Sequence, residues 1–273
     1  MISVLILTLN EEQNLPRCLA AVRWADDILV LDSFSTDRTV EIARQTGARV
    51  LQRRFDDFAR QRNHGLQHGE LKHEWVLHLD ADEVVTPDLK DELLRVVKSG
   101  DKDAYRVASK MMFQDRWLKY SGMYPTYQVR LGRKDKLAFV QVGHGQRENL
   151  PADRLGTLRE GLLHYSFSKG LADWMERHRR YANDEAIHFV DQLAGKSVDW
   201  RGLISMGDAV RRRRALKHLA FYLPARPALR FFYMYCLRRG FLDGRAGLEY
   251  CRWLSRYERM ITLKIRELQK AHS

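Results

Sequence analysis

Trp75-Val-Leu-His-Leu79 is a short, mostly apolar run, and Asp80-Ala-Asp82-Glu83 follows it directly. A run of this length that ends in polar residues is typical of a strand buried on both faces of a parallel sheet. Two carboxylates at positions i and i+2 after such a strand can meet a hard divalent cation. An isolated Asp-x-Asp is also common in solvated acidic turns, so the rest of the sequence has to decide between the two interpretations.

Two similar runs come earlier in the chain. Ile2–Leu7 is a continuous run of β-branched residues and leucine that leads into Thr8-Leu-Asn10-Glu11, and Ile28–Leu31 ends at Asp32. Segments with helical spacing separate the runs, so the sequence predicts an α/β fold with a mostly parallel sheet flanked by helices. Ligands of such sheets bind beyond the carboxyl ends of the strands. The three polar strand ends are therefore predicted to converge on one rim, which is the candidate site.

Shorter strands and then long helices are predicted for the rest of the chain. The expected strands are Ala48–Leu51, Ala104–Ser109, Tyr127–Leu131, Leu137–Val142 and Leu162–Tyr165, and the expected helices include Phe55–Gln67, one capped by Thr86 and Pro87, and Lys169–Leu193. After Gly195 the pattern changes to basic amphipathic helices. We therefore expect two domains, residues 1–195 and residues 196–273.

The positive charge lies at one end of the chain. Residues 201–273 contain 17 Lys and Arg against 5 Asp and Glu, which accounts for the whole net charge of +12. Such asymmetry predicts contact with an anionic surface, either lipid or nucleic acid. The strongest basic run is Arg211–Arg214, and aromatic residues near it can lie at a membrane interface or pack inward: Phe221, Tyr222, Phe231, Phe232, Tyr233 and Tyr235.

Several classes of protein are disfavoured by what the sequence lacks. No G-x-G-x-x-G follows the first strand, which argues against a dinucleotide oxidoreductase. The apolar runs are too short for a signal peptide or a membrane span. The three cysteines have no metal-finger spacing and favour a reducing compartment, so a cytoplasmic protein is expected.

Seven motifs are distributed along the chain. Three of them are Ile6-Leu-Thr-Leu-Asn-Glu-Glu12, Val30-Leu-Asp-Ser-Phe-Ser-Thr-Asp-Arg-Thr39 and Leu77-His-Leu-Asp-Ala-Asp-Glu83. Together these three resemble family 2 glycosyltransferases of the GT-A fold. Four further motifs resemble the branch that contains the lipopolysaccharide inner-core β-1,4-glucosyltransferases: Phe58-Ala-Arg-Gln-Arg-Asn63, Tyr124-Pro-Thr-Tyr-Gln-Val-Arg-Leu131, Leu163-His-Tyr-Ser-Phe-Ser168 and Gly240-Phe-Leu-Asp-Gly-Arg-Ala-Gly-Leu248. The resemblance extends over nearly the whole chain.

The resemblance implies a role for each matching residue. Thr8, Asn10 and Glu11 would line the nucleotide pocket, Asp32 would accept a hydrogen bond from the base, and Arg62 would contact base or phosphate. Asp80 would face the ribose or the outer ligands of a metal, and Asp82 would bind a divalent cation, Mg²⁺ or Mn²⁺. Asp32 is otherwise a helix-capping aspartate, and Arg62 otherwise a helix-surface arginine.

Two further residues complete the candidate site. Glu148, in His144-Gly-Gln-Arg-Glu148, is the candidate base that deprotonates the acceptor hydroxyl. Relatives of this branch usually place histidine directly before the glutamate, whereas Arg147 stands there in this chain, so a surface glutamate paired with Arg147 is the alternative. His164 is a candidate metal ligand because neutral imidazole suits Mn²⁺, and its alternative is a buried structural histidine.

The resemblance implies inverting transfer of a hexose, glucose by analogy with the branch, from a nucleotide-diphosphate sugar, with UDP favoured. The acceptor would be a glycolipid such as heptose of the lipopolysaccharide core, and the basic region would hold the protein on the inner face of the cytoplasmic membrane. A polyprenyl phosphate or a protein is an alternative acceptor. A nucleic-acid-binding protein that uses the arginine-rich tail is the alternative of a different class.

Overall fold

The computed structural model describes residues 1–142, 145–190, 197–204, 209–223 and 225–271. The chain forms two compact units, Met1–Gly170 and Leu171–Ser273. The helix α5 (Gly170–His188), which the sequence analysis placed in the first domain, therefore falls in the second unit. The expected boundary near residue 195 lies outside the described residues.

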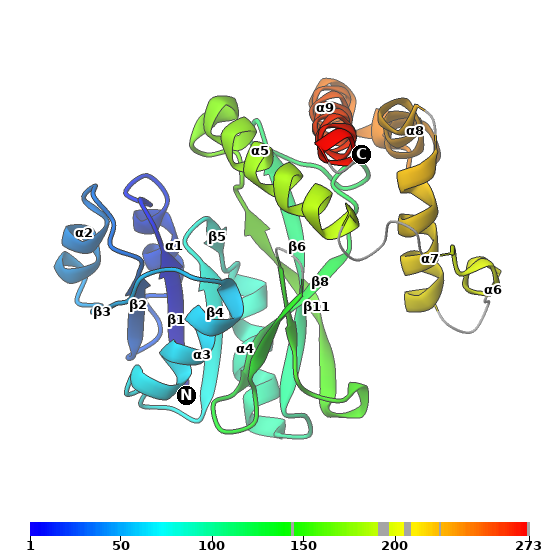
Figure 1. Ribbon diagram of the computed structural model, residues 1–273. Helices are drawn as coiled ribbons and strands as arrows, with labels where there is room; N and C mark the ends of the chain where they lie inside the picture. Colours follow the sequence, from blue (N-terminus) through cyan, green and yellow to red (C-terminus); the bar gives the residue numbers. More distant parts are fainter. Residues whose placement is uncertain (143–144, 191–196, 205–208, 224, 272–273) are drawn as a thin grey trace. The chain divides into compact units, whose positions relative to one another are not determined.

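The first half of unit 1 alternates strands and helices as expected (Figure 1). Its elements are β1 (Ile2–Thr8), α1 (Leu15–Ala21), β2 (Ile28–Asp32), α2 (Thr39–Gln45), β3 (Arg49–Gln52), α3 (Phe58–His68), β4 (Trp75–Asp80), β5 (Glu83–Val84) and α4 (Pro87–Ser99). The predicted start of α4 is confirmed, because the Thr86 side chain accepts a hydrogen bond from the Leu89 backbone N–H at 3.2 Å and Pro87 opens the helix.

The second half of unit 1 is richer in strands. It contains β6 (Ala104–Phe113), β7 (Arg116–Trp117), β8 (Thr126–Arg133), β9 (Phe139–Val142), β10 (Gly145–Glu148), the short helix η1 (Ala152–Arg154) and β11 (Leu155–His164). The nine-stranded sheet has the order β3-β2-β1-β4-β8-β6-β11-β5, with β7 paired to β6. β9 and β10 form a separate antiparallel pair.

The main sheet is mixed, with four parallel pairs and four antiparallel pairs. β3, β2, β1 and β4 are parallel, β8 is inserted antiparallel between β4 and β6, and β11 is parallel to β6. The fold class predicted from the sequence is thus confirmed. The antiparallel direction of β8 was not predicted, because its residues alone do not show which way a strand runs between its neighbours.

Alternating side chains of β1 fill the two layers above and below the sheet. Val4 and Ile6 pack with α1 and α4, whereas Leu5 and Leu7 pack in a second cluster with Leu66 of α3. Each residue of β1 is buried, as expected for a strand covered on both faces. Because β1, β2 and β4 are parallel, their carboxyl ends lie at one edge of the sheet (Figure 1).

Unit 2 is helical. It comprises most of α5, then α6 (Trp200–Leu203), α7 (Ala209–Tyr222), α8 (Arg226–Phe232), a π-helix η3 (Tyr233–Leu237), a short 3-10 helix η4 (Gly240–Asp243) and α9 (Gly244–Ala271). Ala182, Ala186 and Phe189 of the α5 segment pack against Ile261 and Ile265 of α9. Within the described residues, none of the helices has the length and apolar character that crossing a membrane requires.

The basic run predicted to meet an anionic surface lies on α7. Arg211 forms an ion pair with Asp199 at 2.6 Å. The side chains of Arg213 and Arg214 lie outside the described part of the chain. The nearby aromatic residues divide between the two predicted positions: Phe221 stacks on Phe189, whereas Phe232 is exposed.

Candidate active site

Asp80 at the end of β4 lies between two buried arginines. Arg62 of α3 donates to Asp80 Oδ1 at 2.6 Å, and Arg130 of β8 donates to Asp80 Oδ2 at 2.7 Å. Both arginine side chains are almost completely buried, with exposures of 1% and 4%. These two positive charges hold the pKa of Asp80 well below its ordinary value against the opposing effect of burial. Asp80 is therefore ionised and fixed in orientation.

Arg130 reaches this position because β8 contains a β-bulge. Tyr105 of β6 pairs with Leu131 of β8, but the next residue, Arg106, pairs with Val129, so Arg130 is the extra residue. A bulge leaves one residue outside the ladder and re-aims its side chain. Here it directs the guanidinium of a strand residue to the end of β4.

Glu83 completes this buried cluster. One oxygen of Glu83 accepts a hydrogen bond from the Asp80 backbone N–H at 3.0 Å, and the other forms an ion pair with Arg130. Burial raises the pKa of Glu83, and the charge of Asp80 adds to that effect, while Arg130 opposes it. Arg130 thus compensates two buried carboxylates at once.

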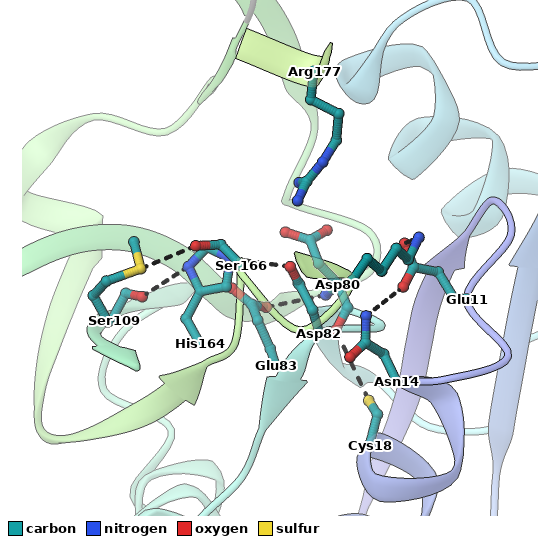
Figure 2. Close-up of polar contacts among 12 residues, drawn as sticks. Glu11, Asn14, Cys18, Asp80, Asp82, Glu83, Ser109, His164, Ser166 and Arg177 are labelled. Carbon is teal, nitrogen blue, oxygen red and sulfur yellow. Dashed lines mark hydrogen bonds and ion pairs between the residues drawn. The ribbon is translucent and has the colours of Figure 1, made fainter. Parts of the chain in front are cut away.

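Asp82 and His164 lie side by side above this cluster (Figure 2). Asp82 Oδ2 is 3.3 Å from His164 Nε2, and His164 Nδ1 is 3.3 Å from the Ser109 hydroxyl. Burial disfavours the charged imidazole. The charge and hydrogen bond of Asp82, with the charges of Glu83 and Asp80, outweigh it and raise the pKa of His164 to about 9. The two residues predicted to bind a metal are therefore in contact, although 82 positions separate them in sequence.

The ends of β1 and β2 form a second group of polar residues. Asp32 is fully buried, and its carboxylate accepts hydrogen bonds from the Thr8 hydroxyl, the Gln52 amide, and both the backbone N–H and hydroxyl of Ser35. Four protein donors thus surround Asp32. A nucleotide base would have to replace one of them, so the role predicted for Asp32 stays a prediction.

Asn10 and Glu11 connect this group to other loops. Asn10 has a φ of 55° and accepts a hydrogen bond from the Thr36 backbone N–H at 2.8 Å. Glu11 forms an ion pair with Lys169 at 2.5 Å and accepts a hydrogen bond from Asn14 at 2.7 Å. Burial raises the pKa of Glu11, although Lys169 opposes the effect. These contacts hold the segment after β11 against the end of β1.

Arg62 is a buried residue and not a surface arginine. Its Nε and Nη1 have no hydrogen-bond partner, and its guanidinium lies 5.9 Å from the centre of the Phe139 ring. Burial lowers the pKa of Arg62 to about 10, so the side chain stays charged at neutral pH. The interpretation of Arg62 as a helix-surface residue is wrong, whereas its predicted contact with the nucleotide stays a prediction.

Glu148 lies on the separate two-stranded sheet and not on the main sheet that carries Asp80. It is on β10 opposite Phe139 and forms an ion pair with Arg106 of β6 at 3.2 Å. Arg106 precedes Ser109, which contacts His164, by three residues, or about 10 Å of strand at ~3.3 Å per residue. The alternative to a catalytic base was a surface glutamate paired with Arg147. In the structure, the ion-pair partner of Glu148 is Arg106. His144, earlier in the same motif, lies outside the described residues.

Three contributors to the site were not assigned a role from the sequence: Arg130, Ser109 and Lys169. Arg130 stands in the motif Tyr124–Leu131. The signal was an arginine among the buried residues at the centre of β8, between Val129 and Leu131. Phe34 was also missed, although it is half exposed and has a φ of 63° in the loop after Asp32, a conformation that is strained for an aromatic residue.

The part of the chain that the structure describes contains no group of three or more Asp, Glu, His or Cys side chains placed to hold a metal. Asp82 and His164 place one carboxylate and one imidazole, both of which are potential metal ligands, in contact with each other. Mg²⁺ and similar cations commonly take one or two protein carboxylates and complete their coordination with substrate phosphates and water. The pair therefore fits a cation that binds together with a diphosphate.

The fold and the acidic strand end at its centre are those of a GT-A glycosyltransferase domain. A family model described as glycosyl transferase family 2 matches residues 3–146, which is more than half of the chain. The protein belongs to glycosyl transferase family 2 and is a glycosyltransferase.

Similar proteins agree with this assignment. An uncharacterized glycosyltransferase of Rickettsia bellii is 27% identical over 203 residues, covering 70% of this chain and 68% of that protein. One of Rickettsia prowazekii is 33% identical over 105 residues, covering 38% of this chain and 35% of that protein. The mannosyltransferase PcManGT of Pyrobaculum calidifontis, whose structure contains GDP-Man and Mn²⁺, shares the fold with a TM-score of 0.52 and 15% identity, covering 97% of this chain and 86% of that one.

Proposed function

We propose that the protein is an inverting, metal-dependent hexosyltransferase that moves glucose from a UDP-sugar to a glycolipid, such as heptose of the lipopolysaccharide core. The observation that carries the proposal is the cluster of Asp80, Asp82 and His164 at the strand ends of a family 2 domain. The nucleotide sugar and Mn²⁺ in the structure of PcManGT support a nucleotide-sugar donor and a divalent cation. The motifs quoted for the lipopolysaccharide branch support the acceptor.

Asp82 and His164 would hold the cation, which would neutralise the diphosphate as it leaves. Arg62 and Arg130 fix both oxygens of Asp80, so this carboxylate presents the same edge to the donor in every turnover. Thr8, Asn10 and Glu11 lie at the end of β1 and would line the nucleotide side of the site. Holding these groups in place before the donor arrives reduces the reorganisation that transfer would otherwise require.

The acceptor and the membrane would be met by unit 2. The basic run on α7 would attract anionic lipid at about 1 kcal/mol per residue near the surface. A protein of this kind would work on the inner face of the cytoplasmic membrane, where nucleotide sugars are present.

A screen of nucleotide sugars for hydrolysis, with Mg²⁺ or Mn²⁺ and without an acceptor, tests the proposal. UDP-glucose hydrolysis that requires the cation is expected. Hydrolysis of only a different nucleotide sugar would change the donor assignment. Absence of both hydrolysis and calorimetric binding for every nucleotide sugar would overturn the proposed reaction.

Metal binding is expected to release a proton from His164. With a pKa of about 9, His164 is charged at pH 7.5, and a metal ligand must be neutral. In the presence of UDP, the affinity for Mn²⁺ should therefore rise about tenfold per pH unit between pH 7 and pH 8.5. Calorimetry in buffers of different ionisation enthalpy should detect about one released proton per metal.

The variant His164→Gln tests whether this proton comes from His164. Its control is His73→Gln, because His73 also faces an aspartate, Asp26, at 2.7 Å. Proton release should persist in the His73 variant and disappear in the His164 variant. Equal release in both would exclude His164 as the ligand.

In the metal-free protein, the stabilisation from the raised pKa of His164 is full below pH 6.5 and is lost as the pH rises through about 9.

Replacing Glu148 with glutamine is expected to abolish transfer and leave donor binding nearly intact. The amide keeps the shape of the side chain and can still accept from Arg106, but it cannot take up a proton. Transfer rate and calorimetric donor affinity measure the two effects separately. Glu160→Gln is the matched control, because Glu160 of β11 also forms an ion pair, with Lys110 of β6 at 3.7 Å. Normal turnover of the Glu148 variant would move the base elsewhere, with Asp115 and Asp153 tested next.

A further inference from the structure

An apolar face is exposed along α8 and η3. The two helices are consecutive, and positions three or four residues apart point to solvent: Leu229, Phe232, Tyr233 and Leu237, with exposures of 47, 54, 39 and 65%. Met234 points the other way and is fully buried. Phe241 and Leu242 of η4 are also half exposed. We call these six residues the α8–η3 face.

This exposure contrasts with that of α9, the longest helix of unit 2. Residues 225–271 are all described, and α9 occupies more than half of them. The α8–η3 face holds six exposed large apolar side chains, whereas the 28-residue α9 holds one, Leu263. Single exposed apolar residues are ordinary, but a continuous group of them marks an interaction surface.

The charges around the face are almost all positive. Residues 222–245 contain five arginines and one acidic residue, Asp243, which is buried. Arg226 is also buried and, like Arg230, pairs with Glu258 of α9, so the exposed arginines are Arg239 and Arg245. Arg239, between η3 and η4, is exposed. Arg245 lies just after η4 at the start of α9 and is exposed even though it pairs with Glu249. An apolar face with aromatic residues and an arginine margin has the composition of a helix that lies in the interface of an anionic membrane.

We propose that the α8–η3 face inserts into the surface of an anionic lipid bilayer. α8 and η3 span 12 residues, or about 18 Å at 1.5 Å per residue. This length is well short of the ~30 Å hydrocarbon core, so the helix would lie in the plane of the interface. The proposal deepens the lipid-linked acceptor proposed above, because insertion would hold the enzyme where such an acceptor is found.

A second copy of the chain is the competing occupant. A two-fold symmetric dimer would place this face against itself. The arginine margin would then meet an identical margin. Glu249 pairs with Arg245, but residues 222–245 contribute no exposed carboxylate to compensate Arg239. Like charges in contact are unfavourable, whereas anionic headgroups neutralise them. The charge distribution therefore favours lipid over self-association.

The face contains a natural reporter position. Cys236 is exposed between Tyr233 and Leu237, whereas Cys18 and Cys251 are buried. A polarity-sensitive fluorophore on Cys236 of the full chain should shift to the blue and brighten when vesicles of phosphatidylcholine with about 30% phosphatidylglycerol, an anionic lipid, are added. Insertion predicts that most of this signal survives in ~1 M salt, where electrostatic attraction is screened.

Vesicle sedimentation with the unlabelled protein gives the second measurement. The double variant Phe232→Gln/Leu237→Gln should bind at least about tenfold more weakly than the wild type, because two apolar anchors are lost. Leu263→Gln is the matched control, since Leu263 is an exposed leucine of similar exposure on α9. Thermal melting should show that both variants are folded.

Each result has a definite meaning. Binding that disappears in ~1 M salt, or that the double variant retains in full, overturns the proposal. Dimerisation of the wild type that the double variant loses, seen by sedimentation velocity without lipid, assigns the face to a second copy instead. UDP-sugar binding by calorimetry separates this proposal from the proposed function: its absence with intact vesicle insertion would refute the donor assignment and leave the insertion face in place.

Discussion

Replacing Asp82 with asparagine or alanine is expected to remove transfer activity while the protein stays folded. The predicted loss is on the order of 10²–10³-fold in rate, the size seen when one group that stabilises developing charge is removed. Metal-dependent binding of the nucleotide sugar should weaken with it, because asparagine keeps one oxygen but loses the charge. Calorimetry with and without Mn²⁺ measures that binding, and transfer is measured in parallel.

The fold should survive because Asp82 is not the sole support of its neighbours. Its backbone carbonyl still accepts a hydrogen bond from the Tyr165 N–H at 2.9 Å in either variant. His164 can release its proton once Asp82 is gone, so no uncompensated charge remains buried. Asp135→Asn, an exposed aspartate paired with Lys136, is the control. If both Asp82 variants kept the metal-dependent donor affinity of the wild type, the cation would not be held at this position.

Replacing Arg130 with methionine is expected to be the most destabilising of these changes. It leaves the buried carboxylate of Glu83 with one hydrogen-bond donor, the Asp80 backbone N–H. The carboxylate of Asp80 is left with one of its two arginines, Arg62. Breaking a buried ion pair costs about 3–5 kcal/mol, which lowers the melting temperature by on the order of 10 °C for a domain of this size. Lysine should not restore it, because a single ammonium cannot match two carboxylates as the planar guanidinium does.

A second substitution separates stability from positioning in the Arg130 variant. Adding Glu83→Gln removes one uncompensated charge and should recover part of the melting temperature but not the donor affinity, since Asp80 stays misoriented. The stability deficit of Arg130→Met should also shrink as the pH falls, because the pKa of Glu83 is already raised and its protonated form needs no cation. Arg95→Met, an exposed arginine of α4, is the control. An unchanged melting temperature for Arg130→Met would show that the buried network is not a support of the site.

The strands that end at Thr8, Asp32 and Asp80 could be predicted from the sequence. Ile2–Leu7 and Trp75–Leu79 are mostly apolar runs because both faces of these strands are covered by helices. The polar residues after each run had to meet at one edge, since parallel strands end on the same side. The contact of Asp82 with His164 followed only in part: the sequence named both residues, but their pairing depends on β11 lying beside β5, where His164 pairs with Glu83.

The surroundings of Glu148 and the boundary between the two units were predicted less well from the sequence. Glu148 was chosen from a motif, and the structure pairs it with Arg106 through strands β6 and β10 that are far apart in sequence. The division between the two units also differs from the expected one, because Lys169–Leu193 looked like the last helix of an α/β domain. Helical spacing shows that a segment is amphipathic, but not which core it packs against.

Two neighbouring residues show that the sequence does not predict whether a given apolar side chain is packed or exposed. Phe231 and Phe232 are chemically identical and adjacent, yet Phe231 stacks on Tyr235 whereas Phe232 is more than half exposed. The sequence alone determined the order of strands and helices, the polar strand ends and the basic end of the chain, because these depend on local periodicity and charge. Only the tertiary structure decided the bulge that aims Arg130 at Asp80 and the helix face that is left uncovered. Both depend on which segments pair and pack, and those contacts join residues that are distant along the chain.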